Sequence, residues 1–251
     1  MEESLAWLVL LLMAFAAEII DSSLGMGYGT ILSPVLIVMG YHPLVVIPSI
    51  LFSQALGGFS AAIFHHRLKN ASFAGNSRDT RIVIVITVLG VVATMGAAFL
   101  ATAIPKSVLK SYIGILVLLM GLILLSRAEF CFSWKKMIGV AILSSFNKGM
   151  SGGGFGPVVT SGQIISGHNH KNAIGVTTAS EVPICLVGFL MFSILKGCPP
   201  MGILIPLTVG SLLATPIGTR ITRYFPEKGL RPLLGILVLI LGIWTLIKTW
   251  L

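Results

Sequence analysis

Seven apolar runs recur along the chain and constrain its fold more than any other feature. They cover residues 5–20, 43–64, 82–104, 111–126, 172–195, 201–219 and 233–247. As α-helix, about 20 apolar residues are enough to cross a hydrocarbon core of roughly 30 Å. The runs do not alternate polar and apolar residues, as the strands of a transmembrane barrel would. The sequence therefore predicts an all-α polytopic membrane protein.

The composition excludes an ordinary soluble domain. Hydrophobic residues make up 55% of the chain and charged residues only 10%, and the mean hydropathy is +0.99; a soluble surface needs more charge. The net charge of +9 does not indicate a nucleic-acid partner, because the basic residues fall in loops between apolar runs. The three cysteines form no CxxC pair, so neither a disulfide framework nor a metal site is expected. No cofactor is expected either.

Two copies of one pattern are visible in the sequence. The segment IGILVLLMG at 113–121 returns as LGILVLILG at 234–242. Three alternate glycines of the first half match three of the second half at an offset of 127 residues, namely Gly25, Gly27 and Gly29 with Gly152, Gly154 and Gly156. We therefore expect a first membrane repeat at 1–128, a cytoplasmic linker at 129–137 and a second membrane repeat at 138–251. Because the first repeat needs the N-terminal run, and acidic residues precede that run, we expect a membrane helix there and not a signal peptide.

The basic residues predict how the chain is oriented in the membrane. They cluster in three loops: Arg67, Lys69, Arg78 and Arg81; Arg127, Lys135 and Lys136; and Arg220, Arg223, Lys228 and Arg231. The positive-inside rule places these loops in the cytoplasm and both termini outside the cytoplasmic membrane, although Lys106 and Lys110 then fall on the outer side. Each repeat makes an odd number of crossings, so the second copy is inverted. Inverted repeats are typical of secondary transporters, whose site lies near the midplane.

Four charged residues cannot be assigned to loops or termini: Glu18, Asp21, Lys148 and Glu181. An ionisable group at membrane depth is costly, so each is a candidate for function. Asp21 is the repeat mate of Lys148, and a pseudo-twofold axis would bring these opposite charges together. They form either a structural salt bridge that lets both charges be buried or a site that handles substrate and protons. Burial favours the neutral form of a carboxyl group, which makes the three acids candidates for proton coupling.

The stretch FNKGMSGGGFGPVVTSG at 146–162 predicts a broken helix. We expect one helix over 137–150 that ends at Gly149 and a short helix that starts at Pro157; SSLGMGYGTILSP predicts the same break in the first half. The sequence leaves open whether 5–40 and 137–167 cross fully or form re-entrant hairpins. Free amides at a helix N-terminus attract anions, and lipid cannot satisfy them. The candidate substrate-binding residues are Ser23, Gly25, Gly27, Tyr28, Gly29, Thr30, Ser33, Gln54, Asn147, Lys148, Ser151, Gly153, Gly154, Phe155, Gly156, Thr160 and Thr177.

Two other classes of function compete with a small-anion transporter. GYG at 27–29 and GFG at 154–156 are similar to potassium-filter signatures, but a filter requires four copies around one axis. A sodium or metal pathway through Glu18, Asp21 and Glu181 is the other cation alternative. An intramembrane enzyme is not expected, because HExxH is missing and a buried serine would have no histidine base beside it. The five histidines are all expected in loops: His42, His65, His66, His168 and His170.

The glycine breaks also carry a family resemblance. SGGGFGPVV followed by AIGVTTAS, and LGMGYGTILSP followed by VIPSILFSQ, resemble the motifs of the TauE/SafE family of membrane permeases, the sulfite-exporter group. Tyr28 and the Pro48–Ser49 pair depart from the family pattern in the first copy. The resemblance implies export of sulfite, sulfoacetate or related small sulfur-containing anions, whereas the residues alone indicate only a small anion. We expect alternating access around a midplane site, with lipid as a partner, and the glycine-rich helix faces are compatible with a homodimer.

Overall fold

The computed structural model describes residues 2–75, 77–126, 134–165, 169–224 and 230–251. Within these ranges the chain forms ten α-helices: α1 Glu2–Leu24, α2 Tyr28–Val38, α3 Pro43–Arg67, α4 Arg78–Ala103, α5 Lys106–Leu125, α6 Trp134–Ser151, α7 Gly156–Ile165, α8 His170–Lys196, α9 Met201–Tyr224 and α10 Leu230–Trp250. The same ranges contain no strand, as expected for an all-α protein. Most of the expected linker lies outside them, and so do Arg127, Cys131, His168 and Lys228.

Seven of these helices are long and apolar enough to cross a membrane, counting only described residues. They are Ser4–Leu24, Pro43–Arg67, Arg78–Ala103, Lys106–Leu125, His170–Lys196, Met201–Thr222 and Pro232–Trp250. Each coincides with one of the apolar runs in the sequence. Large apolar side chains stay exposed on their outer faces, such as Val92 at 69% and Ile194 at 77%. Such surfaces are stable in lipid and not in water, so the spans face a bilayer.

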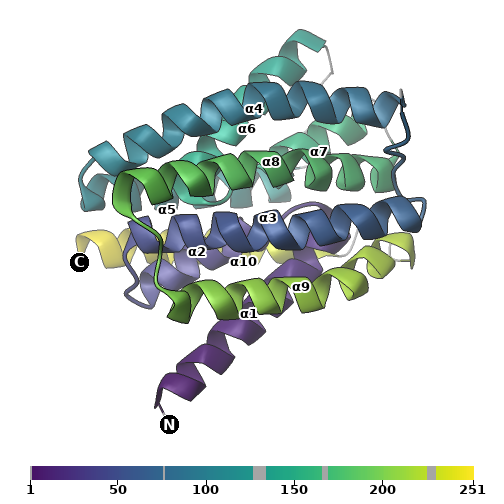
Figure 1. Cartoon of the computed structure of the whole chain (residues 1–251). Helices are drawn as coiled ribbons and strands as arrows, with labels where there is room; N and C mark the ends of the chain where they lie inside the picture. The colour runs from purple at the N-terminus through teal and green to yellow at the C-terminus, as the bar shows by residue number, and fades with distance from the viewer. Residues whose placement is uncertain (1, 76, 127–133, 166–168, 225–229) are drawn as a thin grey trace.

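The helices form one bundle in which the two halves of the chain interleave (Figure 1). The main packing pairs are α1 with α9, α5 with α10, α3 with α8 and α9, and α4 with α6 and α8. Glycines let several of these helices approach closely: a Cβ added at Gly210 of α9 would overlap the Leu11 carbonyl of α1. The core of the bundle is therefore built by both halves together.

Two expectations about helix ends are corrected by the structure. Helix α6 ends at Ser151 and not at Gly149, because the backbone hydrogen bonds continue to Gly152 N. His65 and His66 lie in the last turn of α3, and His170 begins α8, so three histidines expected in loops are helical. Helix α3 continues past the apolar run to Arg67, and Lys69, whose φ of 58° is left-handed, then turns the chain away from the helix.

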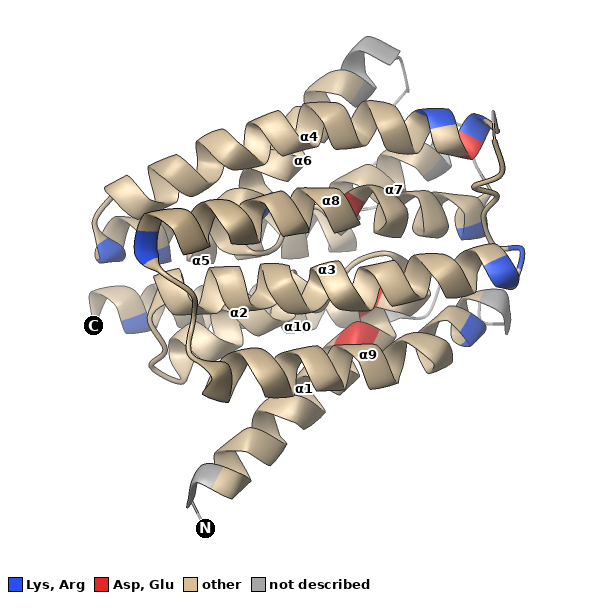
Figure 2. Ribbon diagram, in the orientation of Figure 1, with Lys and Arg blue, Asp and Glu red and all other residues tan. Residues whose placement is uncertain are grey.

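Charged residues gather at the two ends of the bundle, with few between them (Figure 2). One end holds the α3–α4 turn, the start of α8 and the end of α9. The other end holds the start of α5 and the ends of α8 and α10. Both chain termini lie toward this second end (Figure 1). The termini are therefore on one side of the bundle, as the sequence predicts, while the side that faces the cytoplasm stays a prediction.

Candidate functional site

Two long helices, α1 and α6, are each followed by a short glycine-rich break and then by a short helix. Gly25 and Gly27 in the first break have φ of 69° and 137°, and Gly152 and Gly154 in the second have 75° and 81°. These values lie in the left-handed half of backbone space, which side chains with a Cβ rarely adopt. The helices α1 and α6 therefore cannot continue through these positions. The glycines with positive φ lie at equivalent positions of the two breaks, 127 residues apart.

The two breaks, which are far apart in the sequence, touch in the structure. A Cβ added at Gly29 would overlap the backbone carbonyl of Gly152. The amide of Gly154 donates to the hydroxyl of Thr30 at 3.2 Å. Glycine is needed here because the two backbones approach more closely than any side chain allows. The contact brings the first turn of α2 against the end of α6.

Helix α7 adds a second point of contact. A Cβ added at Gly156 would overlap the carbonyl of Gly25. The Thr160 hydroxyl makes a 2.9 Å hydrogen bond to that carbonyl and another to the Thr177 hydroxyl of α8. Gln163 donates its amide to Thr177 at 2.9 Å. A polar strip of α7 and α8 therefore leads away from the first break.

The buried charges form a network beside the breaks. The Lys148 ammonium lies 2.7 Å from a carboxylate oxygen of Glu181, and their side chains are only 1% and 7% exposed. Lys148 also donates to the Gln54 carbonyl oxygen, and the Gln54 amide donates to Asp21 at 3.2 Å. The ion-pair partner of Lys148 is thus Glu181 and not its repeat mate Asp21, because Gln54 lies between the two mates.

Asp21 connects the charges to the first break. Its second oxygen accepts a hydrogen bond of 3.0 Å from the amide of Tyr28, at the start of α2. A carboxylate at a helix N-terminus is favoured by the helix dipole. The Tyr28 side chain extends elsewhere: its hydroxyl contacts Ser53 at 2.8 Å and the Leu207 carbonyl at 3.2 Å. Tyr28 therefore fixes α2 against α3 and α9.

Glu18 is held separately, one turn before Asp21 on α1. Its two carboxyl oxygens accept hydrogen bonds from the hydroxyls of Ser22 at 2.6 Å and Ser211 at 2.9 Å. Among the described residues it forms no salt bridge. The side chain is only 1% exposed. A buried carboxyl group held only by hydroxyls is a suitable proton carrier.

The end of α6 is fixed by local hydrogen bonds. The side-chain carbonyl oxygen of Asn147 accepts a hydrogen bond of 2.5 Å from the Tyr112 hydroxyl of α5. The Ser151 hydroxyl donates to the Asn147 backbone carbonyl at 2.8 Å and accepts from the Gly153 amide at 3.1 Å. Phe155 is buried in the second break at 1% exposure. Asn147 and Ser151 therefore hold the shape of the break that carries Lys148.

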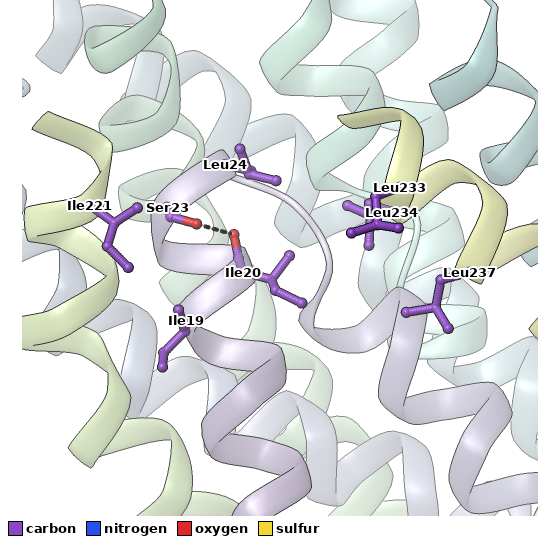
Figure 3. A pocket seen from close by; sticks show the side chains of 8 residues that line it. All are labelled: Ile19, Ile20, Ser23, Leu24, Ile221, Leu233, Leu234 and Leu237. Atoms are coloured by element: carbon purple, nitrogen blue, oxygen red, sulfur yellow. Dashed lines mark hydrogen bonds between the residues drawn. The ribbon is translucent and has the colours of Figure 1, made fainter. Parts of the chain in front are cut away.

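Two of the predicted site residues lie apart from the charges. Ser23 donates its hydroxyl to the Ile20 carbonyl at 3.0 Å and lines an apolar groove between α1, α9 and α10 (Figure 3). The groove has a volume of about 330 Å³ and is lined by Ile19, Ile20, Ser23, Leu24, Ile221, Leu233, Leu234 and Leu237. Ser33 is buried, and its hydroxyl has no hydrogen-bond partner within the described residues.

Sequence reasoning missed several polar residues of this region. Ser53, Ser211, Tyr112 and Gln163 all contact the predicted site residues. Ser53 is next to the predicted Gln54, and Gln163 is three residues after the predicted Thr160, so both had a signal nearby, whereas Tyr112 and Ser211 lie far from the breaks in the sequence. Only the packing of α3, α5, α7 and α9 around the breaks brings them to the site.

A bundle of membrane spans with broken helices and buried ionisable groups is the architecture of a membrane transporter. Residues 10–245 match the sequence model described as "Sulfite exporter TauE/SafE". The chain belongs to this family, and it is a multi-pass membrane transporter and not an enzyme.

A comparison with individual proteins agrees with this family membership. The chain is 26% identical over 249 residues to the "Probable membrane transporter protein YtnM" of Bacillus subtilis (strain 168), which covers 93% of this chain and 80% of that protein. No solved structure matches the chain. The family resemblance read from the glycine motifs is therefore confirmed.

Proposed function

We propose that this transporter exports a small sulfur-containing anion, such as sulfite or sulfoacetate, across the cytoplasmic membrane. The anion binds where the two glycine breaks meet, beside Lys148. The observation that carries this proposal is the position of Lys148: it is a fully buried cation three residues before the end of α6, where the second break begins. The family match supports the sulfur-containing anion as the class of substrate.

The proposed mechanism is alternating access between two inverted repeats. Helices α5 and α10 carry the matching apolar segments and pack antiparallel, since Gly114 faces Leu246 whereas Gly121 faces Leu239. Helices α3 and α8, which are equivalent at the 127-residue offset, are antiparallel as well: Gly188 of α8 faces Leu51 of α3, whereas Gly175 faces His65. Equivalent helices that run in opposite directions support an inverted pair of repeats. Rocking of one repeat against the other would open the shared site to each side in turn.

Proton coupling follows from the ion pair. The ammonium group of Lys148 is occupied by Glu181, so an incoming anion competes with that carboxylate for the same cation. Protonation of Glu181 removes the competitor and leaves Lys148 available to the substrate. Anion and proton therefore bind together at this site, with Asp21 and Glu18 as further proton carriers.

A cation pathway has less support. No group of three or more His, Cys, Asp and Glu side chains suited to a metal ion occurs in the part of the chain that the structure describes. Of the three buried acids, Glu181 is already paired with Lys148. A homodimer, which the sequence also suggests, stays a prediction.

The binding proposal is tested by the thermal stability of the detergent-purified protein in different salts. Sulfite, sulfoacetate, thiosulfate, sulfate and chloride are compared, each with sodium and with potassium. A ligand that binds the native state stabilises it by about 2.7 kcal/mol when present at 100 times its dissociation constant. We expect a rise in melting temperature with one sulfur oxyanion, whichever cation accompanies it. A rise that follows sodium or potassium instead would support the cation pathway.

Replacing Glu181 by glutamine should tighten anion binding and make it less dependent on pH. Glutamine has the shape of the protonated acid but cannot compete as an anion for Lys148. We expect binding at neutral pH to be roughly tenfold tighter, or about 1.4 kcal/mol. The unliganded variant should be less stable, because Lys148 then lacks a counter-ion. Calorimetric titration of sulfite at acidic and neutral pH measures this, and equal pH dependence in both proteins would contradict it.

A further inference from the structure

The four residues of the buried charge network are two pairs of equivalent positions. Asp21 of α1 and Lys148 of α6 are related by the 127-residue offset, and Gln54 of α3 is related to Glu181 of α8 in the same way. In the first half Gln54 donates to Asp21 at 3.2 Å, and at the equivalent place in the second half Glu181 pairs with Lys148 at 2.7 Å. Each half therefore closes its own part of the network by the same contact.

Between the two halves, only one of two equivalent contacts is made. Lys148 donates to the Gln54 carbonyl oxygen, and the equivalent contact would join Asp21 to Glu181. Within the described residues these two carboxyl groups share no hydrogen bond. An amide and an ammonium group thus occupy the middle of the network, and the two acids lie at its ends.

The glycine breaks show the same one-sidedness. Their backbone contacts occur in equivalent pairs, as the close approaches described above show. The Thr160 hydroxyl donates to the Gly25 carbonyl at 2.9 Å, and the equivalent hydroxyl, that of Ser33, would donate to the Gly152 carbonyl. Ser33 is instead 1% exposed and has no hydrogen-bond partner among the described residues. A buried hydroxyl of this kind calls for an explanation.

The outer helices differ between the halves as well. Tyr112 of α5 donates to Asn147 of α6 at 2.5 Å, so these two helices are closed against each other. The equivalent positions in the other half are Leu233 of α10, at an offset of 121 residues, and Ile20 of α1. These two side chains line the apolar groove of about 330 Å³ (Figure 3). Helix α10 is therefore open toward α1 where α5 is closed toward α6.

These one-sided contacts describe one state of the alternating-access cycle proposed above, and the following step rests on that proposed function. When two inverted repeats exchange conformations, each one-sided contact is replaced by its equivalent in the other half. The Ser33 hydroxyl would then find the carbonyl that it lacks here, and α10 would close against α1. The contact of Lys148 with Gln54 would be replaced by a contact of Asp21 with Glu181.

We propose that the coupling proton binds between Asp21 and Glu181 in the opposite-facing state. Two carboxyl groups in direct contact inside a protein cannot both be ionised, so the pair holds one shared proton. In the present state Gln54 and Lys148 separate the two acids, and no shared proton is needed. Proton binding therefore favours the opposite-facing state. Loss of the proton leaves two carboxylates that repel each other, which returns the network to its present order.

The groups that face the two acids leave the shared proton in control of the pH response. The titratable ones come from four helices and are Glu18 of α1, Tyr28 of α2, Lys148 of α6 and Cys185 of α8. The facing polar residues of α3 and α9, Gln54 and Ser211, are neutral. Helix α7 has no titratable residue, and α4 has none beyond Arg81. Lys148 balances one of the two carboxylates and not both, so the pair needs one proton.

The test measures two equivalent helix separations by pulsed electron spin resonance, on full-length protein in lipid nanodiscs. One spin-label pair, Ala16→Cys with Ile236→Cys, spans α1 and α10. The equivalent pair, Leu143→Cys with Ile115→Cys, spans α6 and α5; all four side chains are exposed. The three native cysteines are changed to alanine. As the pH falls, the first distance should shorten and the second should lengthen, and the ratio of the two states should change by up to about tenfold per pH unit, the limit for one proton.

Two variants remove the proton site without changing the size of the side chains. Asp21→Asn and Glu181→Gln each leave one carboxyl group in the pair, which then needs no shared proton. In both variants the ratio of the two states should change by less than about twofold over the same pH range. Asp79→Asn, which alters an acid at the start of α4 outside the network, is the matched control and should keep the wild-type response.

The outcomes separate the proton site from the proposed function. If both variants keep the wild-type pH response, the proton binds elsewhere and the proposed pair is wrong. If the distances respond to added sulfite and never to pH, the pair is also wrong, while alternating access stands. If they never change although the labelled protein transports sulfite in liposomes, the exchange of conformations is wrong and the anion site stands. A pH response that both variants lose, in a protein that carries no sulfite, would support the proton site and overturn the proposed substrate.

Discussion

Replacing Gly29 by alanine should abolish transport and lower the free energy of unfolding by about 3 kcal/mol, the upper part of the usual cost of overpacking. The new Cβ would occupy the position of the Gly152 carbonyl oxygen. Backbone atoms cannot move aside as the end of a flexible side chain can. The two breaks must therefore separate, and Tyr28 and Thr30 move away from Asp21 and Gly154.

Thermal unfolding in detergent and sulfite flux in liposomes measure both effects. Gly153→Ala is the reciprocal change, because its Cβ would meet the backbone of Gly29 and Thr30. Gly162→Ala on α7 is the control, since a Cβ there meets nothing within 4 Å and alanine favours helix. Normal flux and stability in G29A would show that the breaks do not need their close contact.

The sequence was sufficient to predict the spans and the breaks. Span positions depend on length and hydropathy, which can be read directly from the residues, so all seven runs recur as candidate spans. The breaks follow from glycine, which is the one residue that adopts the positive φ of Gly25 and Gly152 at little cost. The burial of Glu18, Asp21, Lys148 and Glu181 was also predictable, because each lies in or beside an apolar run.

The pairing of the charges could not be predicted. The repeat offset aligns Asp21 with Lys148, but an alignment gives equivalent positions and not contacts. Which acid reaches Lys148 depends on how α8 packs against α3 and on the intervening Gln54. His65 was misplaced for a related reason: hydropathy falls at this residue, whereas helical hydrogen bonding continues to the turn at Lys69.

Replacing Lys148 by methionine should reduce sulfite transport at least a hundredfold. The interaction of a buried ammonium group with a bound anion contributes several kcal/mol to binding. Methionine keeps the length and apolar stem of the side chain but has no charge. The single change also leaves the Glu181 carboxyl buried without its partner, which costs about 3–5 kcal/mol of stability. Loss of transport by K148M alone therefore does not separate a binding role from a structural salt bridge.

The double variant Lys148→Met/Glu181→Met separates the two roles. Replacing both partners of a buried ion pair by apolar residues is often neutral for stability, so we expect its melting temperature to return close to that of the wild type. A purely structural salt bridge would then be dispensable, and transport would return as well. A lysine that binds the anion cannot be replaced in this way. Lys196→Met, an exposed lysine at the end of α8, is the matched control.

The most direct test is therefore the flux of labelled sulfite through K148M/E181M in liposomes, next to wild type and K196M. We expect a stable double variant with no saturable sulfite flux, while K196M transports as the wild type does. Saturable flux at the wild-type rate through the stable double variant would contradict anion binding by Lys148, because Lys148 would then be part of the scaffold and not of the anion site.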